Sequence, residues 1–163
     1  MRILGIDPGT ARLGWGIIDI VSGKITPYAF GCITTSELST PEKRLVSIYD
    51  ELTKLLKKYK PEIMAIEDLF FATNAKTIIP VGQARGVALL AAGKNNIPTV
   101  SYSPLTVKQT ICGYGKALKP QVQQMITKIL KLQSIPKPDD TADALAIALT
   151  HAYSYKMKQV TSV

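Results

Sequence analysis

The sequence has few of the residues that mark secreted, membrane-bound or zinc-binding proteins. Its two cysteines, Cys32 and Cys112, lie far apart and in no CxxC or Cys/His cluster, so neither a disulfide scaffold nor a zinc site is expected. No apolar run approaches the roughly 18 residues of a membrane span, and no secretory signal is apparent. These absences predict a cytoplasmic protein in a reducing compartment, with no membrane partner.

Acidic residues are also absent from a long central part of the chain. Residues 1–68 hold nine Lys or Arg and nine Asp or Glu, whereas residues 69–138 hold nine Lys or Arg and no acid. Solvated surfaces usually mix both signs. A stretch of seventy residues whose charges are all positive therefore favours a surface for a polyanion, most simply nucleic acid. A basic protein without such a partner is the alternative.

The length of 163 residues fits one domain, and 46% hydrophobic residues are enough for a core. We expect this domain to span residues 1–155, followed by a C-terminal tail over 156–163.

Short apolar runs bounded by turn residues predict five strands, over 3–7, 13–21, 25–35, 62–68 and 98–102. Helical spacing of apolar residues predicts five helices, over 41–60, 74–95, 105–111, 122–130 and from 139 onward.

The order of these segments predicts an α/β fold. The first three strands, joined by short turns, indicate an antiparallel meander, and the helix over 41–60 would return strand 62–68 parallel to the first strand. Gly14 and Gly16 inside a strand indicate close approach of another backbone. Gly82 and Gly86 share one helix face, which would allow another helix, such as one of a second subunit, to approach closely; a locally weak helix is the equal alternative.

Four carboxylates fall at the ends of these segments. Asp7 and Glu67 end two parallel strands, so they should meet at one edge of the sheet, although Asp-Pro-Gly is also ordinary turn chemistry. Asp140 and Asp143 share a face at the start of the last helix, where aspartates also serve as caps. All-oxygen ligand sets favour Mg²⁺ or Mn²⁺ over zinc. Two such ions would suit in-line displacement at a phosphodiester.

Four segments, in order along the chain, resemble the RuvC family of bacterial Holliday-junction resolvases. They are Gly-Ile-Asp-Pro-Gly-Thr at 5–10, Ile-Glu-Asp-Leu-Phe-Phe at 66–71, Gly-Gln-Ala-Arg-Gly at 82–86 and Asp-Thr-Ala-Asp-Ala-Leu-Ala at 140–146. The resemblance implies a ribonuclease H-like fold, with a five-stranded mixed sheet flanked by helices. It implies a homodimer that uses Mg²⁺, two ions per site with Mn²⁺ as a substitute, to nick opposing strands of four-way junction DNA. It also suggests a RuvA–RuvB branch-migration complex as a partner.

The resemblance assigns roles to individual residues. Asp7, Glu67, Asp140 and Asp143 are the implied catalytic metal ligands, although some members carry His at the position of Asp140, so its role stays open. Phe70 falls where the family places an aromatic residue that stacks on junction bases. Lys108 and Lys119 match basic positions near the scissile phosphate. The basic stretch adds three further candidates for DNA binding: Lys76, Arg85 and Lys116.

Other functions fit parts of the sequence. A ribonuclease H-fold nuclease that acts on RNA could share the Asp-Pro-Gly-Thr start, but the match across Phe70, residues 83–86 and the last helix argues against it. A catalytically idle junction-binding protein would not need four intact carboxylates. An actin-like or sugar-kinase ATPase needs two such domains around its nucleotide, and 163 residues are too few; no P-loop sequence is present either.

Overall fold

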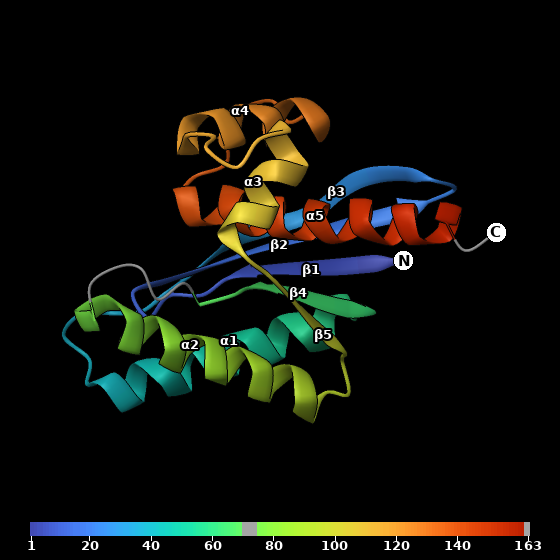
Figure 1. Cartoon of the computed structure of the whole chain (residues 1–163). Helices are drawn as coiled ribbons and strands as arrows, with labels where there is room; N and C mark the ends of the chain where they lie inside the picture. The colour runs from blue at the N-terminus through green and yellow to red at the C-terminus, as the bar shows by residue number, and fades with distance from the viewer. Residues whose placement is uncertain (70–74, 162–163) are drawn as a thin grey trace.

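The five strands form one mixed sheet. The computed structural model of this chain describes residues 1–69 and 75–161, with side chains at 75–77 and 158–161 outside that description. Strands β1 (Arg2–Asp7), β2 (Arg12–Val21) and β3 (Lys24–Thr34) form an antiparallel meander. Strand β4 (Ile63–Glu67) pairs parallel with β1, and β5 (Thr99–Tyr102) pairs parallel with β4. The order β3-β2-β1-β4-β5 confirms the predicted sheet and makes β1 central (Figure 1).

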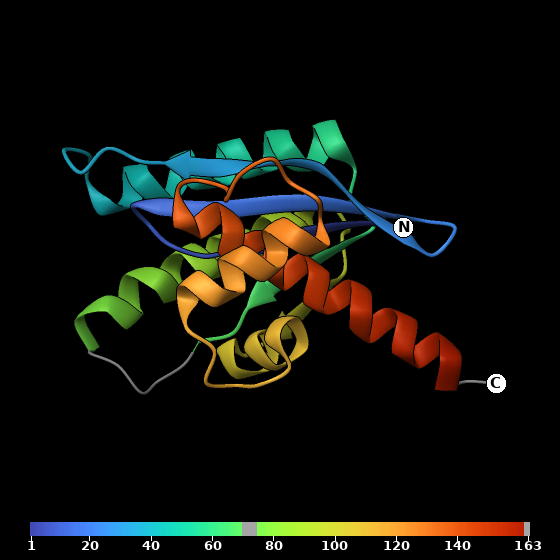
Figure 2. The ribbon, with the colours of Figure 1, turned by 90° about the horizontal axis from the view of Figure 1, so that it is seen from above.

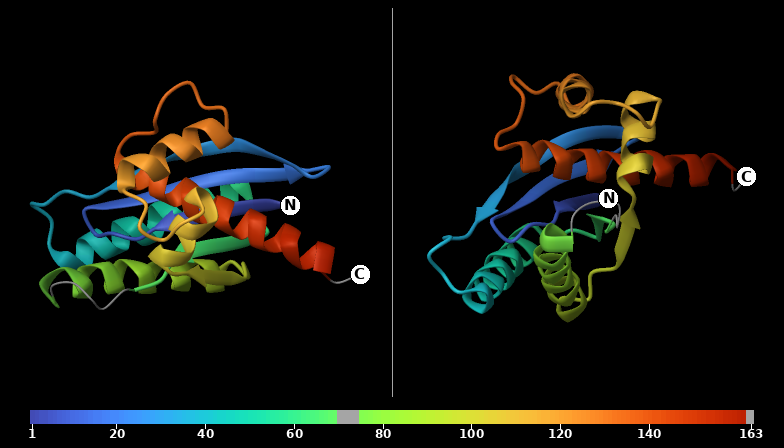
Figure 3. Two further views of the ribbon diagram at one scale, coloured as in Figure 1. Left: turned by 45° about the horizontal axis from the view of Figure 1, so that its top comes forward. Right: turned by 60° about the vertical axis from the view of Figure 1, so that its left-hand side comes forward.

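Helices cover both faces of the sheet. Helices α1 (Pro41–Tyr59) and α2 (Ala75–Lys94) lie on one face. Helices α3 (Pro104–Cys112), α4 (Lys119–Ile129) and α5 (Asp139–Thr161) lie on the other, as Figure 3 shows. The five predicted helices are therefore confirmed. Each face of the sheet buries its own apolar cluster, so the core has two layers.

Helix α1 is the crossover that brings β4 beside β1. Its buried residues Ile48, Leu52 and Leu56 are spaced four apart, so they form one stripe that packs on the sheet. The helix ends at Tyr59 and is capped by Lys60, which adopts a left-handed backbone conformation before Pro61. The chain then enters β4 in register with β1, with Ile66 beside Ile6. Asp7 and Glu67 consequently end neighbouring parallel strands.

Strand β1 divides its side chains between the two layers. Leu4 and Ile6 belong to the cluster under α1 and α2, whereas Ile3 belongs to the cluster under α5. Because side chains alternate along a strand, Gly5 and Asp7 share the α5 face with Ile3. The alternation therefore aims the Asp7 carboxylate at the layer that contains α5.

Glycines in the sheet let α5 approach the strand backbones. A Cβ atom on Gly5 would lie 2.0 Å from the carbonyl oxygen of Ala144, and one on Gly14 would lie 2.0 Å from that of Asp140. The predicted close approach at Gly14 is thus confirmed. Helix α5 crosses the strands obliquely when the molecule is seen from above (Figure 2), and its first turns lie over β1 and β2.

Helix α5 continues to Thr161, across the predicted division between domain and tail at residue 155, which stays a prediction. Among the described residues, no helix is long and apolar enough to cross a membrane.

Candidate active site

Four carboxylates converge at the carboxyl end of β1. Asp7 ends β1 and Glu67 ends the adjacent strand β4. Asp140 and Asp143 lie in the first turns of α5, which the small residues of the sheet admit close to β1 and β2. The structure therefore brings together the four side chains that the sequence predicted as one set.

The charges of these carboxylates repel one another. Burial raises the pKa of Asp7 well above its ordinary value, and the charges of Glu67, Asp143 and Asp140 raise it further. Burial and the charge of Asp143 raise the pKa of Glu67 to about 7. Burial also raises the pKa of Asp143, although the neighbouring Lys119 ammonium opposes this effect. Such a cluster of buried acids needs either protons or cations to be stable.

Lys119, the first residue of α4, bridges two acids of α5. Its Nζ atom lies 2.7 Å from Oδ2 of Asp143 and 2.6 Å from Oδ2 of Asp139. Burial lowers the pKa of Lys119, but the bonds to Asp139 and Asp143 and the charges of these acids together raise it above its ordinary value, so the ammonium stays charged. Asp139, by contrast, has its pKa lowered by Lys119 and is exposed. Lys119 thus places a positive charge at one side of the four carboxylates.

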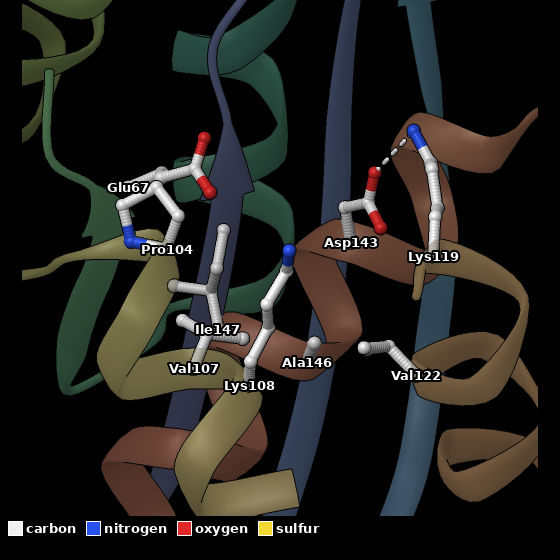
Figure 4. Close-up of a pocket in the computed structure, with 9 residues that line it drawn as sticks. All are labelled: Glu67, Pro104, Val107, Lys108, Lys119, Val122, Asp143, Ala146 and Ile147. Atoms are coloured by element: carbon white, nitrogen blue, oxygen red, sulfur yellow. Dashed lines mark ion pairs between the residues drawn. The ribbon is translucent and has the colours of Figure 1, made fainter. Parts of the chain in front are cut away.

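A cavity of about 190 Å³ opens beside Lys119. Glu67, Lys108, Lys119 and Asp143 provide its charged groups, and Figure 4 shows that they rise above apolar side chains such as Val107 and Ile147. Lys108 comes from α3, and its positive charge partly offsets the burial of Glu67. The cavity therefore holds two carboxylates and two ammonium groups around one small volume.

The donor set suits a hard divalent cation. All four predicted ligands offer carboxylate oxygens, which Mg²⁺ and Mn²⁺ prefer. The Oδ2 atom of Asp140 is buried and accepts no hydrogen bond among the described groups, so it has capacity for a cation. As they stand, however, no three acid, imidazole or thiol side chains in the described ranges are close enough to hold one ion together. The Lys119 ammonium is bonded to Asp143, so the carboxylates would hold one ion together only after their side chains move.

The other predicted DNA-binding residues lie in different surroundings. Arg85 bonds through Nε to the Glu67 carbonyl oxygen and through NH2 to Ser101 Oγ, and lies 3.3 Å from Asp68. These contacts anchor the end of β4, and hence the position of Glu67. Lys116 is exposed in the segment between α3 and α4. Phe70 and the side chain of Lys76 lie outside the described residues, so their roles stay predictions.

Three residues near the site were not predicted from the sequence. Asp139 holds Lys119, and Asp68 pairs with Arg85. Arg12, the first residue of β2, lies 3.5 Å from Asp140 and 3.8 Å from Asp139. Asp139 was visible as an extra acid beside Asp140, but no sequence pattern linked it to Arg12 or Lys119, because those contacts depend on tertiary packing.

The sequence matches the family described as crossover junction endodeoxyribonuclease RuvC over residues 3–151. The chain belongs to the RuvC family. A RuvC from Fusobacterium nucleatum is 58% identical over 158 residues, which cover 97% of this chain and 83% of that protein. Family membership thus confirms the resemblance and the deoxyribonuclease class that the sequence predicted.

Solved structures of RuvC proteins share this fold. RuvC from Thermus thermophilus superposes with a TM-score of 0.88 at 35% identity, covering 97% of both chains. The same protein in complex with a Holliday junction substrate gives a TM-score of 0.87 at 34% identity, covering 96% of both chains. The RuvC fold of this chain is therefore the predicted ribonuclease H-like one.

Proposed function

We propose that this chain is a Holliday junction resolvase that hydrolyses one phosphodiester in each of two opposing strands of four-way junction DNA. The observation that supports this most is the convergence of four carboxylates at the end of β1 in a chain of the RuvC family. The one-sided positive charge of residues 69–138 supports a polyanionic substrate. Chromosomal recombination would place this activity in the cytoplasm.

In the proposed reaction, Asp7, Glu67, Asp140 and Asp143 would hold two Mg²⁺ ions. When bound, such ions would supply positive charge for an in-line displacement at the phosphodiester. Lys108 and Lys119, which face the same cavity, offset the charge of the scissile phosphate. Asp139 keeps Lys119 at the rim of the cavity. Arg85 holds the end of β4, so that Glu67 keeps its place beside Asp7.

We further propose that the enzyme acts as a homodimer, because a four-way junction offers two equivalent strands and closed two-fold dimers are common. Helix α2 presents a stripe suited to this contact. Ile79 and Leu90 are 64% and 56% exposed, and a Cβ atom on the intervening Gly86 would touch nothing within 4 Å. This face therefore carries two exposed apolar side chains and an open glycine position, beside the exposed Gln83. A RuvA–RuvB complex is the proposed partner for placing the dimer on a junction.

The proposed function is tested by nicking of a synthetic four-way junction, labelled on each strand in turn, with Mg²⁺ or with EDTA. We expect paired nicks at symmetric positions with Mg²⁺ and none in EDTA, with linear duplex or with the Asp7→Asn variant. Tight binding without nicks would instead indicate an idle junction-binding protein. Cleavage of an RNA junction in preference to DNA would indicate the RNA-directed alternative.

The dimer proposal is tested by Leu90→Glu, which places a charge on the apolar stripe of α2. We expect this variant to be monomeric by light scattering and to lose the symmetric pairing of nicks, because an unpaired buried charge opposes association. Leu38→Glu is the matched control, since Leu38 is 98% exposed and lies off α2. Equal dimer content in both variants would contradict the α2 interface.

A further inference from the structure

A second cleft adjoins the carboxylates and shares no lining residue with the cavity beside Lys119. The volume of this cleft is about 520 Å³. Asp140 lines the cleft, whereas Asp143 lines the cavity beside Lys119. Its walls come from the turn between β1 and β2, from α2 and from the start of α5. The residues that form them include Pro8, Gly9, Thr10, Pro80, Val81 and Asp139. A strand that reaches the carboxylates could therefore continue into this cleft.

Arg12 carries the only positive charge among the described residues that line this cleft. Its NH1 atom lies 3.5 Å from Oδ2 of Asp140 and 3.8 Å from Oδ1 of Asp139, which is close enough for charge attraction but too far for good hydrogen bonds. Lys119, by comparison, approaches its two acids to 2.6 and 2.7 Å. The Arg12 side chain is also 53% exposed, so it is held loosely at the mouth of the cleft.

Hydrogen bonds hold the backbone around Arg12 in place, so only the Arg12 side chain is free to move. Thr35 donates its backbone N–H to the Ala11 carbonyl oxygen and its hydroxyl to that of Thr10. Arg44 of α1 then donates to the same hydroxyl of Thr35. Arg12 itself pairs with Thr34 in the sheet. The turn is thus anchored while the guanidinium remains able to rotate.

We propose that Arg12 is a phosphate-binding residue for the DNA strand and that a divalent cation at Asp140 releases it from the carboxylates to the DNA. The proposal rests on the proposed function, because it names a contact with the same substrate. Asp140 Oδ2 accepts no hydrogen bond, so a cation would bind there in competition with Arg12. A phosphate in the cleft then gives the guanidinium an anionic partner that matches its planar fork.

This arrangement couples the two ligands of the enzyme. Cation binding frees Arg12 for a phosphate, and a phosphate that holds Arg12 leaves Asp140 to the cation. Because such coupling is reciprocal, the cation tightens DNA binding by the same factor by which DNA tightens cation binding. Apolar walls such as Pro8, Pro80 and Val81 strengthen the charge contacts, since they keep water away from one side of the cleft.

The test measures the affinity of the full chain for a fluorescent four-way junction, once in Ca²⁺, a hard cation that takes oxygen ligands, and once in EDTA. We expect Arg12→Gln to weaken binding about tenfold in Ca²⁺, as for one charge-assisted hydrogen bond, and by less than about twofold in EDTA. In Ca²⁺ the salt dependence of the variant should also fall by about 0.9 in log–log slope, for one lost phosphate contact. Arg12→Lys should restore part of the affinity, because it keeps the charge but not the fork.

A second measurement follows Ca²⁺ binding to the DNA-free protein by calorimetry. Arg12→Gln should bind Ca²⁺ several-fold more tightly than the parent chain, because it removes a positive charge that competes for Asp140. The variant is thus expected to gain cation affinity and to lose junction affinity, which a misfolded protein would not do. Lys24→Gln is the matched control, since Lys24 is an exposed cation at the start of β3, opposite the end of β2 that lies far from Arg12, and it should change neither quantity.

Equal loss of junction affinity in Ca²⁺ and in EDTA would overturn the release by a cation and leave Arg12 as a simple surface cation. No loss in either condition would overturn the phosphate contact and leave Arg12 as a counter-charge for the acids. Failure of the parent chain to bind a junction at all would overturn the proposed function, and the calorimetry would still show whether Arg12 competes for Asp140.

Discussion

The charged side chains at the two ends of β1 have opposite surroundings. At the amino end, the Arg2 guanidinium forms two parallel hydrogen bonds of 2.8 Å with Asp19, donates a third to the Tyr59 carbonyl oxygen and lies over the Tyr28 ring. At the carboxyl end, Asp7 lies among other acids, and the nearby Arg12 keeps 3.5 Å from Asp140. One end of β1 thus has a fully hydrogen-bonded ion pair, whereas the acids at the other end repel one another.

The pKa directions express the same difference. Hydrogen bonds from Arg2 lower the pKa of Asp19, so its charged form stabilises the fold. Burial and neighbouring acids raise the pKa of Asp7, so its charged form destabilises the fold. A divalent cation would relieve that repulsion. The comparison indicates that the amino end of β1 serves stability, and it supports the proposal that the carboxyl end binds a cation.

The largest expected effect is the loss of nicking in Asp7→Asn. The substitution keeps the size of the side chain but removes the charge at the centre of the acid set, so we expect the single-turnover rate to fall by about 10³-fold. The free energy of unfolding without metal should not decrease, because repulsion is removed with the charge. A variant that keeps more than about a tenth of the rate would place the catalytic centre elsewhere.

The next effect concerns Glu67→Gln in metal-free protein. Because the pKa of Glu67 rises from 4.5 to about 7 on folding, the folded state holds its proton more tightly, and stability falls as pH rises between these values. Glutamine does not titrate, so Glu67→Gln should exceed the parent chain in unfolding free energy by roughly 3 kcal/mol at pH 8 and by little at pH 4. Urea unfolding in EDTA at both pH values measures this. The same difference at both would contradict the raised pKa.

A smaller effect is expected at the other end of the strand. Arg2→Met keeps most of the side-chain stem but removes the hydrogen bonds to Asp19, so the free energy of unfolding should fall by about 2 kcal/mol. The nicking rate should stay within about twofold, because Arg2 lies at the opposite end of β1 from Asp7. Thermal unfolding and nicking of the same preparation separate the two quantities. A large loss of nicking in a folded Arg2→Met protein would remove the distinction between the two ends.

The sequence predicted those parts of the site that follow from periodicity and strand direction. Asp7 and Glu67 had to meet because parallel strands end at one edge, and Gly14 indicated the approach of a backbone that proved to be that of Asp140. Arg12 and Lys119 meet Asp139 only because β2 and α4 each pack against α5, which local patterns do not encode. A sequence of this kind therefore predicts the acids better than the cations around them.

Arg85 shows the same limit from another side. Its charge and its place in the basic stretch made it a candidate for DNA binding, which stays a prediction, and no pattern indicated that its guanidinium would lie against the Glu67 carbonyl oxygen and Ser101. No pattern in the chain states which way a long side chain turns once its helix has docked. Charge composition therefore predicts a class of ligand more readily than the contact made by each cation.

The most direct test of the central claim is a crystal structure of the protein soaked in Mn²⁺, with the ion located by its anomalous scattering. We expect an Mn²⁺ ion bonded to Asp7 and at least two of Glu67, Asp140 and Asp143, with the Lys119 ammonium moved away from Asp143. An acid set without Mn²⁺, with Lys119 still bonded to Asp143, would contradict the claim that the carboxyl end of β1 is a cation site.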